Sequence, residues 1–519
     1  MRFAPSVAVV CLSLALSLRM AASADAPLDR LLLKIRAAAG TPYAYHVRTI
    51  FSDDADPGSV RRTLDVEGLR RFVHHCAGDA CNGRYDDGQH SFQTNLNGTA
   101  LPIQAPSAFD LTLQAVIVDD FADAGFRAAG GSVALREPVA RGGKNFFRIT
   151  VSAPRGAPFD VLVDSQSYLV AGTDDGRTEI DFRYAEPREG TLVLPSDLEW
   201  RGARGRTVHF ERWSIVETPL APPAGLAPHF ENGAATLKML ASRASDVPLV
   251  PCTLGGQTVA CLLDTGNSGL SMSLELAEAL GIEPSGGGFE IRGIGQYATG
   301  VAEGPALKLG SVTFPAARYV VLHDIHQYGY DVVLGADVFA RTSVTLDYGR
   351  REVGFAPSGG TADPGTPNLR FENFVPVLDV TLGTIPAALA LDSGDESTIN
   401  LGQDFYERNP SVFAPTRSVG VAGVGGTSVE VLGQIPAVHV ANFTILNQRI
   451  GATKKLHATA DGHLGSGFLA HFSVRLDYAN GRVELVPRPG DASVTQRENY
   501  GPAGLQPSGR AGAATPNPS

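Results

Sequence analysis

The chain has 519 residues, of which 43% are hydrophobic and 19% charged, so it should fold into two to four domains. Its 58 glycines and 34 prolines favour turn-rich β structure over helical bundles. A formal net charge of −11 and the lack of a basic stripe argue against a nucleic-acid partner.

The first 24 residues are typical of an export signal. Arg2 supplies a positive start, residues 7–18 form an apolar run, and residues 22–24 give an A-x-A cleavage site before Asp25. The run is too short to anchor the chain across a bilayer. We therefore expect a signal peptide at residues 1–24 and an exported protein, either periplasmic or secreted.

Four cysteines remain after cleavage, in two close pairs that an oxidising compartment would allow to form disulfides. Cys252 and Cys261 flank a predicted hairpin, and a turn at residues 256–257 would place them directly opposite each other. Cys76 and Cys81 could form a second disulfide or remain free thiols. With residues 74–75, both histidines, they could instead bind a metal, but a single cluster is weak evidence for zinc, and we predict no metal.

Residues 25–217 form the first predicted domain. Apolar residues recur at helical spacing over residues 28–35, and Gly40 closes that helix. A second helix is predicted at residues 108–126. The rest alternates like strands, most clearly at residues 146–151, 159–163, 178–184 and 207–215. An α+β domain built on a long antiparallel meander follows from this pattern.

The end of this domain resembles the outer-membrane lipoprotein carrier (LolA/LolB-like) fold, a half-open β-barrel. The resemblance is carried by residues 163–170, Tyr184, Gly190, residues 194–195 and the strand at 207–215. It implies an apolar concavity able to hold a lipid, lipoprotein or peptide, and no catalytic residues. The alternative is a plain β domain that positions the rest of the chain.

Breaks in composition divide the remaining chain. Pro/Ala-rich residues open a linker at 218–245, and a Gly/Pro-rich stretch forms a second linker at 358–370. The segments between them, 246–357 and 371–488, are two further predicted domains. Residues 489–519 contain few large apolar side chains and should be a disordered tail.

These two segments repeat each other. Residues 248–264 align without gaps on 376–392, and each copy closes a predicted hairpin with Asp-Thr-Gly or Asp-Ser-Gly. Further matches follow at a constant offset: Gly-x-Gly at 293–295 and 423–425, Leu-Gly at 334–335 and 464–465, and Leu-Asp-Tyr at 346–348 and 476–478. A repeat of this length indicates a duplicated domain.

Each copy resembles a retropepsin-like aspartic protease lobe, and the tandem resembles a pepsin-like bilobal enzyme. The resemblance implies a mainly β, bilobal acid-protease fold in a monomer, with Asp264 and Asp392 as the catalytic pair. It also implies that the Thr265 and Ser393 hydroxyls hydrogen-bond across the lobe interface, and that Gly266 and Gly394 allow the two loops to approach closely. A flap from each lobe would cover the cleft, and the flaps would carry Gly293, Ile294, Gly295, Gly423, Val424 and Gly425.

The chemistry requires two carboxylates because a close pair shares one proton. The ionised member takes a proton from water and the other donates to the scissile carbonyl oxygen, so no cofactor is needed. Three residues depart from the family pattern. Asp395 and Glu396 follow the second motif, where we expect them to face solvent, and His463 stands at a usually hydrophobic position, where we expect a partly buried side chain.

Other features have simpler interpretations. Asp347 and Asp477 are expected to form turns, and Tyr297 lies just past the first Gly-x-Gly, where it could contact substrate. The sequence therefore predicts an aspartic endopeptidase acting on peptides or proteins. The alternative is a non-catalytic periplasmic protein that binds a lipid, lipoprotein or peptide with degenerate protease lobes.

Overall fold

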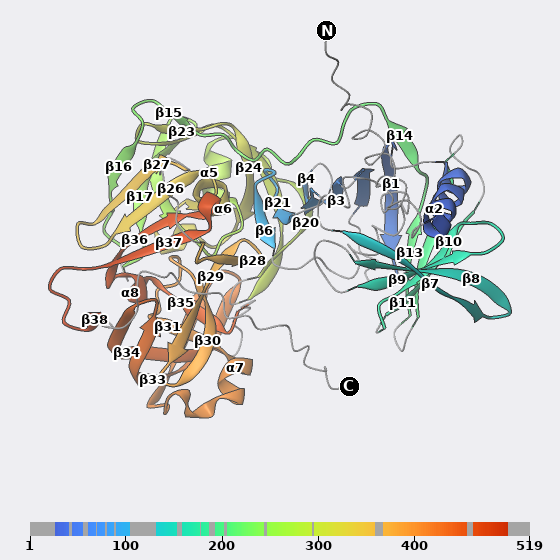
Figure 1. Cartoon of the computed structure of the whole chain (residues 1–519). Helices are drawn as coiled ribbons and strands as arrows, with labels where there is room; N and C mark the ends of the chain where they lie inside the picture. Colours follow the sequence, from blue (N-terminus) through green and yellow to red (C-terminus); the bar gives the residue numbers. More distant parts are fainter. Residues whose placement is uncertain are drawn as a thin grey trace, which may run out of the picture. The chain divides into compact units, whose positions relative to one another are not determined.

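The computed structural model divides the chain into two compact units, described separately here. Unit 1 comprises Met1–His75, Arg84–Ser91 and Ala105–Pro222, and unit 2 the remaining residues. The mainly β prediction is confirmed (Figure 1). The structure describes residues 26–40, 44–54, 61–68, 70–77, 80–87, 90–103, 131–152, 158–176, 178–185, 192–201, 205–242, 246–292, 295–358, 367–453 and 460–496.

Two predictions from the first 130 residues lie outside that range, namely the signal peptide and the helix at residues 108–126. Among the helices that the structure describes, none is both long and apolar enough to cross a membrane.

In the part of unit 1 that the structure describes, a curled antiparallel sheet packs against the helix α2 (Ala26–Ala39). The apolar face of α2, with Leu28, Leu31, Leu32 and Ile35, is buried in the core of the sheet. The strand order is β3-β2-β1-β13-β12-β11-β10-β9-β8-β7. Their bounds are β1 (His46–Asp53), β2 (Arg61–Glu67), β3 (Arg70–Ala77), β7 (Ser132–Arg141), β8 (Lys144–Ser152), β9 (Phe159–Asp164), β10 (Val170–Asp174), β11 (Glu179–Arg183), β12 (Asp197–Arg201) and β13 (Arg206–Phe210).

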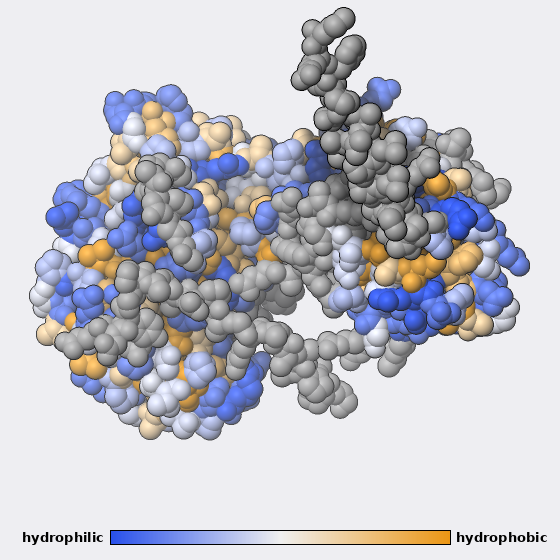
Figure 2. Space-filling model, in the orientation of Figure 1, coloured by the Kyte–Doolittle hydropathy of each residue, from blue (hydrophilic) through white to orange (hydrophobic). Residues whose placement is uncertain are grey.

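The strand predicted at residues 207–215 is in fact two strands. It divides into β13 and β14 (Ser214–Val216), which pair with different parts of β1. Between them Trp213 turns inward, packs on Phe210 and donates its indole N–H to the Pro195 carbonyl oxygen. On the visible face of unit 1, Figure 2 shows hydrophobic residues gathered over the strands beside α2.

Unit 2 contains two lobes, here called the first lobe (residues 246–358) and the second lobe (residues 367–496). The first lobe runs through β17 (Leu249–Leu254), β18 (Gln257–Leu263), β19 (Leu270–Ser273), α5 (Leu274–Ala279), β20 (Ser285–Arg292), β21 (Gln296–Gly304), β22 (Leu307–Leu309), β23 (Val312–Phe314), β24 (Ala317–Leu322), β25 (Val332–Leu334), α6 (Ala336–Phe339), β26 (Thr342–Asp347) and β27 (Glu352–Pro357).

The second lobe repeats most of this order. It runs through β28 (Arg370–Glu372), β29 (Val375–Leu382), β30 (Ile385–Leu391), β31 (Ile399–Gly402), α7 (Gln403–Arg408), β32 (Arg417–Gly423), β33 (Gly426–Val440), β34 (Phe443–Thr453), β35 (Gly462–Leu464), α8 (Ser466–Leu469), β36 (Phe472–Asp477) and β37 (Arg482–Pro487). β38 (Val494–Gln496), within the segment expected to be a disordered tail, pairs with β34.

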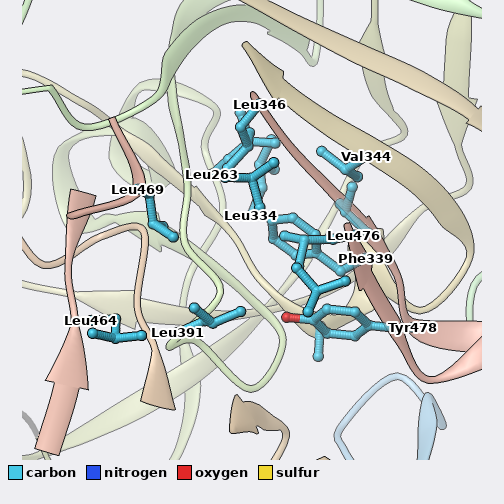
Figure 3. Packing of buried hydrophobic residues seen from close by; sticks show 14 of the residues in the cluster. Leu263, Leu334, Phe339, Val344, Leu346, Leu391, Leu464, Leu469, Leu476 and Tyr478 are labelled. Atoms are coloured by element: carbon cyan, nitrogen blue, oxygen red, sulfur yellow. The ribbon is translucent and has the colours of Figure 1, made fainter. Parts of the chain in front are cut away.

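The strand pairings repeat as well. β18 runs parallel to β25 as β30 does to β35, and β25 pairs antiparallel with β19 as β35 does with β31. The lobes join where β26 pairs with β36. Equivalent side chains of the two lobes therefore share one core, as Figure 3 shows for the pairs Leu263 and Leu391, Leu334 and Leu464, and Leu346 and Leu476.

The hairpin β17–β18 corrects one prediction. Its turn is at Gly255 and Gly256, whose φ angles of +58° and +82° suit a tight hairpin turn and strain other residues. Cys252 consequently lies opposite Val259, and its disulfide to Cys261 runs diagonally across the strands. Cys76 and Cys81 form the second disulfide.

Candidate active site

The two Asp-containing loops occupy equivalent places in the lobes. Asp264 follows β18, and its N–H donates to the Leu334 carbonyl oxygen at 3.0 Å. Asp392 follows β30, and its N–H donates to the Leu464 carbonyl oxygen at the same distance. Each loop is thus hydrogen-bonded to the end of β25 or β35. The leucines of the repeated Leu-Gly motifs therefore fix the positions of the two aspartates.

Glycine allows the two loops to meet closely. A Cβ atom at Gly266 would lie 2.7 Å from Asp392 Oδ2, and one at Gly394 would lie 2.7 Å from Asp264 Oδ1. Any larger residue would therefore separate the loops. The two catalytic candidates share a hydrogen bond between their carboxyl groups.

Thr265 and Ser393 lock the loops together across the lobe interface. The Thr265 hydroxyl donates to the Leu391 carbonyl oxygen at 2.6 Å, and the Ser393 hydroxyl donates to the Leu263 carbonyl oxygen at 2.8 Å. Each hydroxyl also accepts the N–H of the other residue, at 2.9 and 3.1 Å. Both side chains are buried, so the bonds are shielded from water.

The two carboxyl groups differ in their surroundings. Burial and then the negative charge of Asp392 raise the pKa of Asp264 well above its usual value. Burial also raises the pKa of Asp392, but the nearby positive charge of His463 opposes that rise. The two carboxyl groups therefore titrate as one coupled pair, in which His463 stabilises the ionised form beside Asp392.

His463 and Asp395 lie beside Asp392. His463 Nδ1 is 3.2 Å from Asp392 Oδ2 and 3.4 Å from Asp395 Oδ2. Burial lowers the pKa of His463, but its close contact with Asp395 and the surrounding carboxylates outweigh burial and raise it. Burial raises the pKa of Asp395, but the contact with His463 and its positive charge outweigh burial, so the net direction is downward.

The expectation that Asp395 faces solvent is therefore wrong, because His463 offers it an inward ion-pair partner, whereas Glu396 is exposed. The ligand atoms of Asp392, Asp395 and His463 all lie within 4.8 Å of one another, close enough for a metal ion. A metal would require the neutral imidazole, whereas the surrounding carboxylates favour the protonated one.

The predicted flaps are the hairpins β20–β21 and β32–β33. Gly293 and Ile294 lie outside the described residues, but the Gly295 N–H donates to the Val424 carbonyl oxygen at 3.2 Å, so the two flaps meet. Gly423 ends β32 and pairs with Gly426. Asp324 accepts from the Tyr297 hydroxyl at 3.1 Å and from the Gly425 N–H at 2.9 Å, and so joins both flaps to the first lobe.

Sequence reasoning missed a turn at residues 95–99 that docks on the first lobe within unit 2. The buried Asp337 carboxylate accepts hydrogen bonds from Asn95 Nδ2 and Asn97 Nδ2, both at 2.7 Å, and from the Thr99 hydroxyl at 2.5 Å. Asn95 Nδ2 also donates to the Ser268 carbonyl oxygen at 2.8 Å, in the loop that carries Asp264. The Asn-Gly pair indicates a turn, but nothing in the sequence indicates what it contacts.

The expected turn-forming role of the paired Leu-Asp-Tyr motifs agrees with the structure. Asp347 accepts the Arg350 N–H and Asp477 accepts the Asn480 N–H. In Figure 3 the Tyr478 hydroxyl points toward Leu391, the residue before Asp392.

Comparison with known proteins finds a similarity between the first lobe and aspartyl proteases. A family model for aspartyl proteases matches residues 250–338. Among solved structures, a retropepsin-like aspartic protease from Rickettsia conorii is 15% identical, with 25% of this chain and 95% of that chain covered and a TM-score of 0.19. A LolA superfamily protein from Nitrosomonas europaea is 12% identical over 37% of this chain and 94% of that chain, with a TM-score of 0.28. No curated protein matched significantly.

Proposed function

We propose that this protein is an aspartic endopeptidase of pepsin-like, bilobal architecture, which hydrolyses peptide bonds with a water activated between Asp264 and Asp392. The observation that carries the proposal is the paired carboxyl groups, brought together from equivalent loops and joined by a hydrogen bond. Buried carboxyl groups this close share a proton and supply an acid and a base from one residue type.

The proposed reaction uses each aspartate twice. The Asp392 carboxylate takes a proton from the water, whose oxygen attacks the scissile carbonyl carbon while Asp264 donates its proton to the carbonyl oxygen. In the resulting gem-diol, the Asp264 carboxylate takes back a hydroxyl proton as the carbonyl reforms. The C–N bond breaks, and Asp392 returns its proton to the leaving nitrogen, which restores both side chains.

Residues around the pair fit this role. The cross-lobe bonds of Thr265 and Ser393 fix the distance between the two loops, and the flaps meet at Gly295 and Val424. The proposal extends to an exported, periplasmic or secreted, monomer that acts on peptides or proteins. The non-catalytic alternative, with a lipid, lipoprotein or peptide held by unit 1, predicts lobes without hydrolytic activity.

The test is cleavage of an unbiased peptide mixture between pH 3 and pH 7 by the full mature chain. We expect cleavage that a pepstatin-type inhibitor blocks and that EDTA leaves unchanged, because no step needs a metal. Product analysis by mass spectrometry would identify the cut sites. Absence of cleavage across the range, or complete loss with EDTA, would contradict the proposal.

A further inference from the structure

The duplication makes the two lobes comparable position by position. Val333 in β25 and His463 in β35 occupy equivalent places, next to the Leu-Gly motifs. Because His463 lies 3.2 Å from Asp392, the sheet face that carries this position is the face that meets the catalytic carboxylates. A substrate bound at the pair would contact this face in both lobes.

In the first lobe this face is mainly apolar, although Ser271 lies opposite Val333. Val333 belongs to a small buried cluster with Leu249, Leu262, Leu322 and Ile325. Tyr297 of one flap and Val424 of the other pack against the same cluster. The first lobe therefore presents hydrocarbon to a substrate side chain held beneath the flaps.

In the second lobe the same face carries a row of polar residues, next to the apolar Ala390 and Leu432. His463 lies opposite Asn400, and Asn400 lies opposite Gly451. Directly opposed residues share a sheet face, as do residues two apart in one strand, which adds Thr453. The Thr453 hydroxyl donates to Asn400 Oδ1 at 3.0 Å, and Glu430 lies opposite Thr453. A polar row thus runs from the catalytic pair to Glu430.

Glu430 ends this row as a buried carboxylate. Its residue is only 4% exposed, and it makes no hydrogen bond or ion pair with any residue that the structure describes. A Cβ atom at Gly451 would lie 2.0 Å from Glu430 Oε1, so the carboxylate fills space that only glycine leaves free. A buried carboxylate without a partner is costly, and a cation brought by a ligand would relieve that cost.

The electrostatic surroundings of Glu430 also favour the binding of a cation. Burial first, and then the charge of Asp395, raise the pKa of Glu430 to about 7, while the exposed Arg449 opposes the rise. Two carboxylates, Asp395 and Glu430, therefore border this face. Of these two, only Asp395 has an ion-pair partner among the described residues.

We propose that the polar face of the second lobe is a specificity site for a lysine or arginine side chain of the substrate, with Glu430 as its ion-pair partner. The apolar face of the first lobe takes a hydrophobic side chain on the other side of the scissile bond. This inference rests on the proposed endopeptidase function and names the peptides on which it acts.

The test compares peptides that carry Lys, norleucine or Gln at each of the two positions flanking the scissile bond, with Leu at the other. At pH 7 or above, wild type should cleave the better Lys peptide with a kcat/KM at least about tenfold above its norleucine counterpart. Glu430→Gln should remove most of that preference and leave norleucine cleavage nearly unchanged. Glu484→Gln, which removes an exposed carboxylate of the same lobe, is the matched control and should retain the preference.

The Lys preference should also grow as the pH rises through about 7, because Glu430 ionises in this range beside Asp395 and Arg449. A preference equal in wild type and Glu430→Gln would overturn this inference and leave the endopeptidase proposal standing. If wild type cleaves nothing, binding of the same labelled peptides to Asp264→Asn decides the point. Tighter binding of Lys than norleucine peptide, lost in the additional Glu430→Gln, supports the site, and equal binding contradicts it.

Discussion

At the level of single residues, His463 and Asp395 make the loop that carries Asp392 different from the loop that carries Asp264. Val333 and Asn267 occupy the corresponding places in the first lobe, so Asp264 has no such ion pair behind it. The imidazolium lowers the pKa of Asp392 and of Asp264, while the Asp395 carboxylate raises that of Asp392. The two side chains therefore adjust the pH range of the pair in opposite directions.

Substitutions at these positions should shift the acidic limb of the kcat/KM profile with opposite signs. His463→Val removes a cation, raises the pKa of the pair and moves the limb to higher pH, by about one unit or more. Asp395→Asn leaves the cation uncompensated and moves the limb to lower pH. The double variant removes both charges and should return close to wild type. Single variants that leave the limb in place would contradict this account of Asp392.

The sequence predicts the chemistry of Asp264 and Asp392 because each aspartate has a local signature, a hairpin ending in Asp-Thr/Ser-Gly. It does not predict the inward turn of Asp395, because that depends on His463, which is 68 positions later in the chain and adjacent only after β35 pairs beside the loop. The same reason hides Glu430, whose burial depends on the glycine at position 451 in the neighbouring strand.

At the level of elements, the flaps are joined through Asp324. Its two carboxylate oxygens accept from Tyr297 on the first flap and from the Gly425 N–H on the second. In the proposed endopeptidase, substrate would enter beneath the flaps, so this junction would have to open in each catalytic cycle.

Asp324→Ala should loosen both flaps. We expect faster amide hydrogen exchange at residues 420–427, because the Gly425 N–H loses its acceptor. Tyr297→Phe removes only the bond from the first flap and should produce a smaller increase there. Equal exchange in wild type and Asp324→Ala would show that other contacts hold the flaps together.

The turn at residues 95–99 is a second element that contacts the first lobe from a distant part of the sequence. Asn95 and Asn97 both donate to the buried Asp337, but only Asn95 also reaches the Ser268 carbonyl oxygen next to the first catalytic loop. Either alanine substitution leaves the Asp337 carboxylate short of a donor and should cost about 1–3 kcal/mol of stability.

The two variants should differ in catalysis. Asn95→Ala should lower kcat by about tenfold with little change in KM, because the loop carrying Asp264 loses a positioning contact. Asn97→Ala, with similar thermal stability, should keep kcat near wild type. A kcat that falls equally in both variants would reduce the turn to a purely stabilising role.

At the level of the whole molecule, the sequence predicts the mainly β class and the repeated strand pairings of unit 2, since the repeat preserves hairpins, glycines and Leu-Gly motifs in order. The turn at residues 95–99 shows where that reasoning stops. Sequence boundaries place it in the first domain, whereas the structure groups Phe92–Gln104 with the lobes in unit 2. The turn is attached to the first lobe by long-range hydrogen bonds to Asp337, and no local pattern of charge or hydrophobicity predicts these bonds.

If Asp264 and Asp392 act as one catalytic pair, each must be essential, which kcat for Asp264→Asn and Asp392→Asn on one cleaved peptide would measure. Both variants should lose at least about a thousandfold, because neither an acid nor a base alone completes the reaction. Thermal unfolding should show that each variant stays folded. Substantial activity in either folded variant would contradict the shared pair and place the chemistry elsewhere.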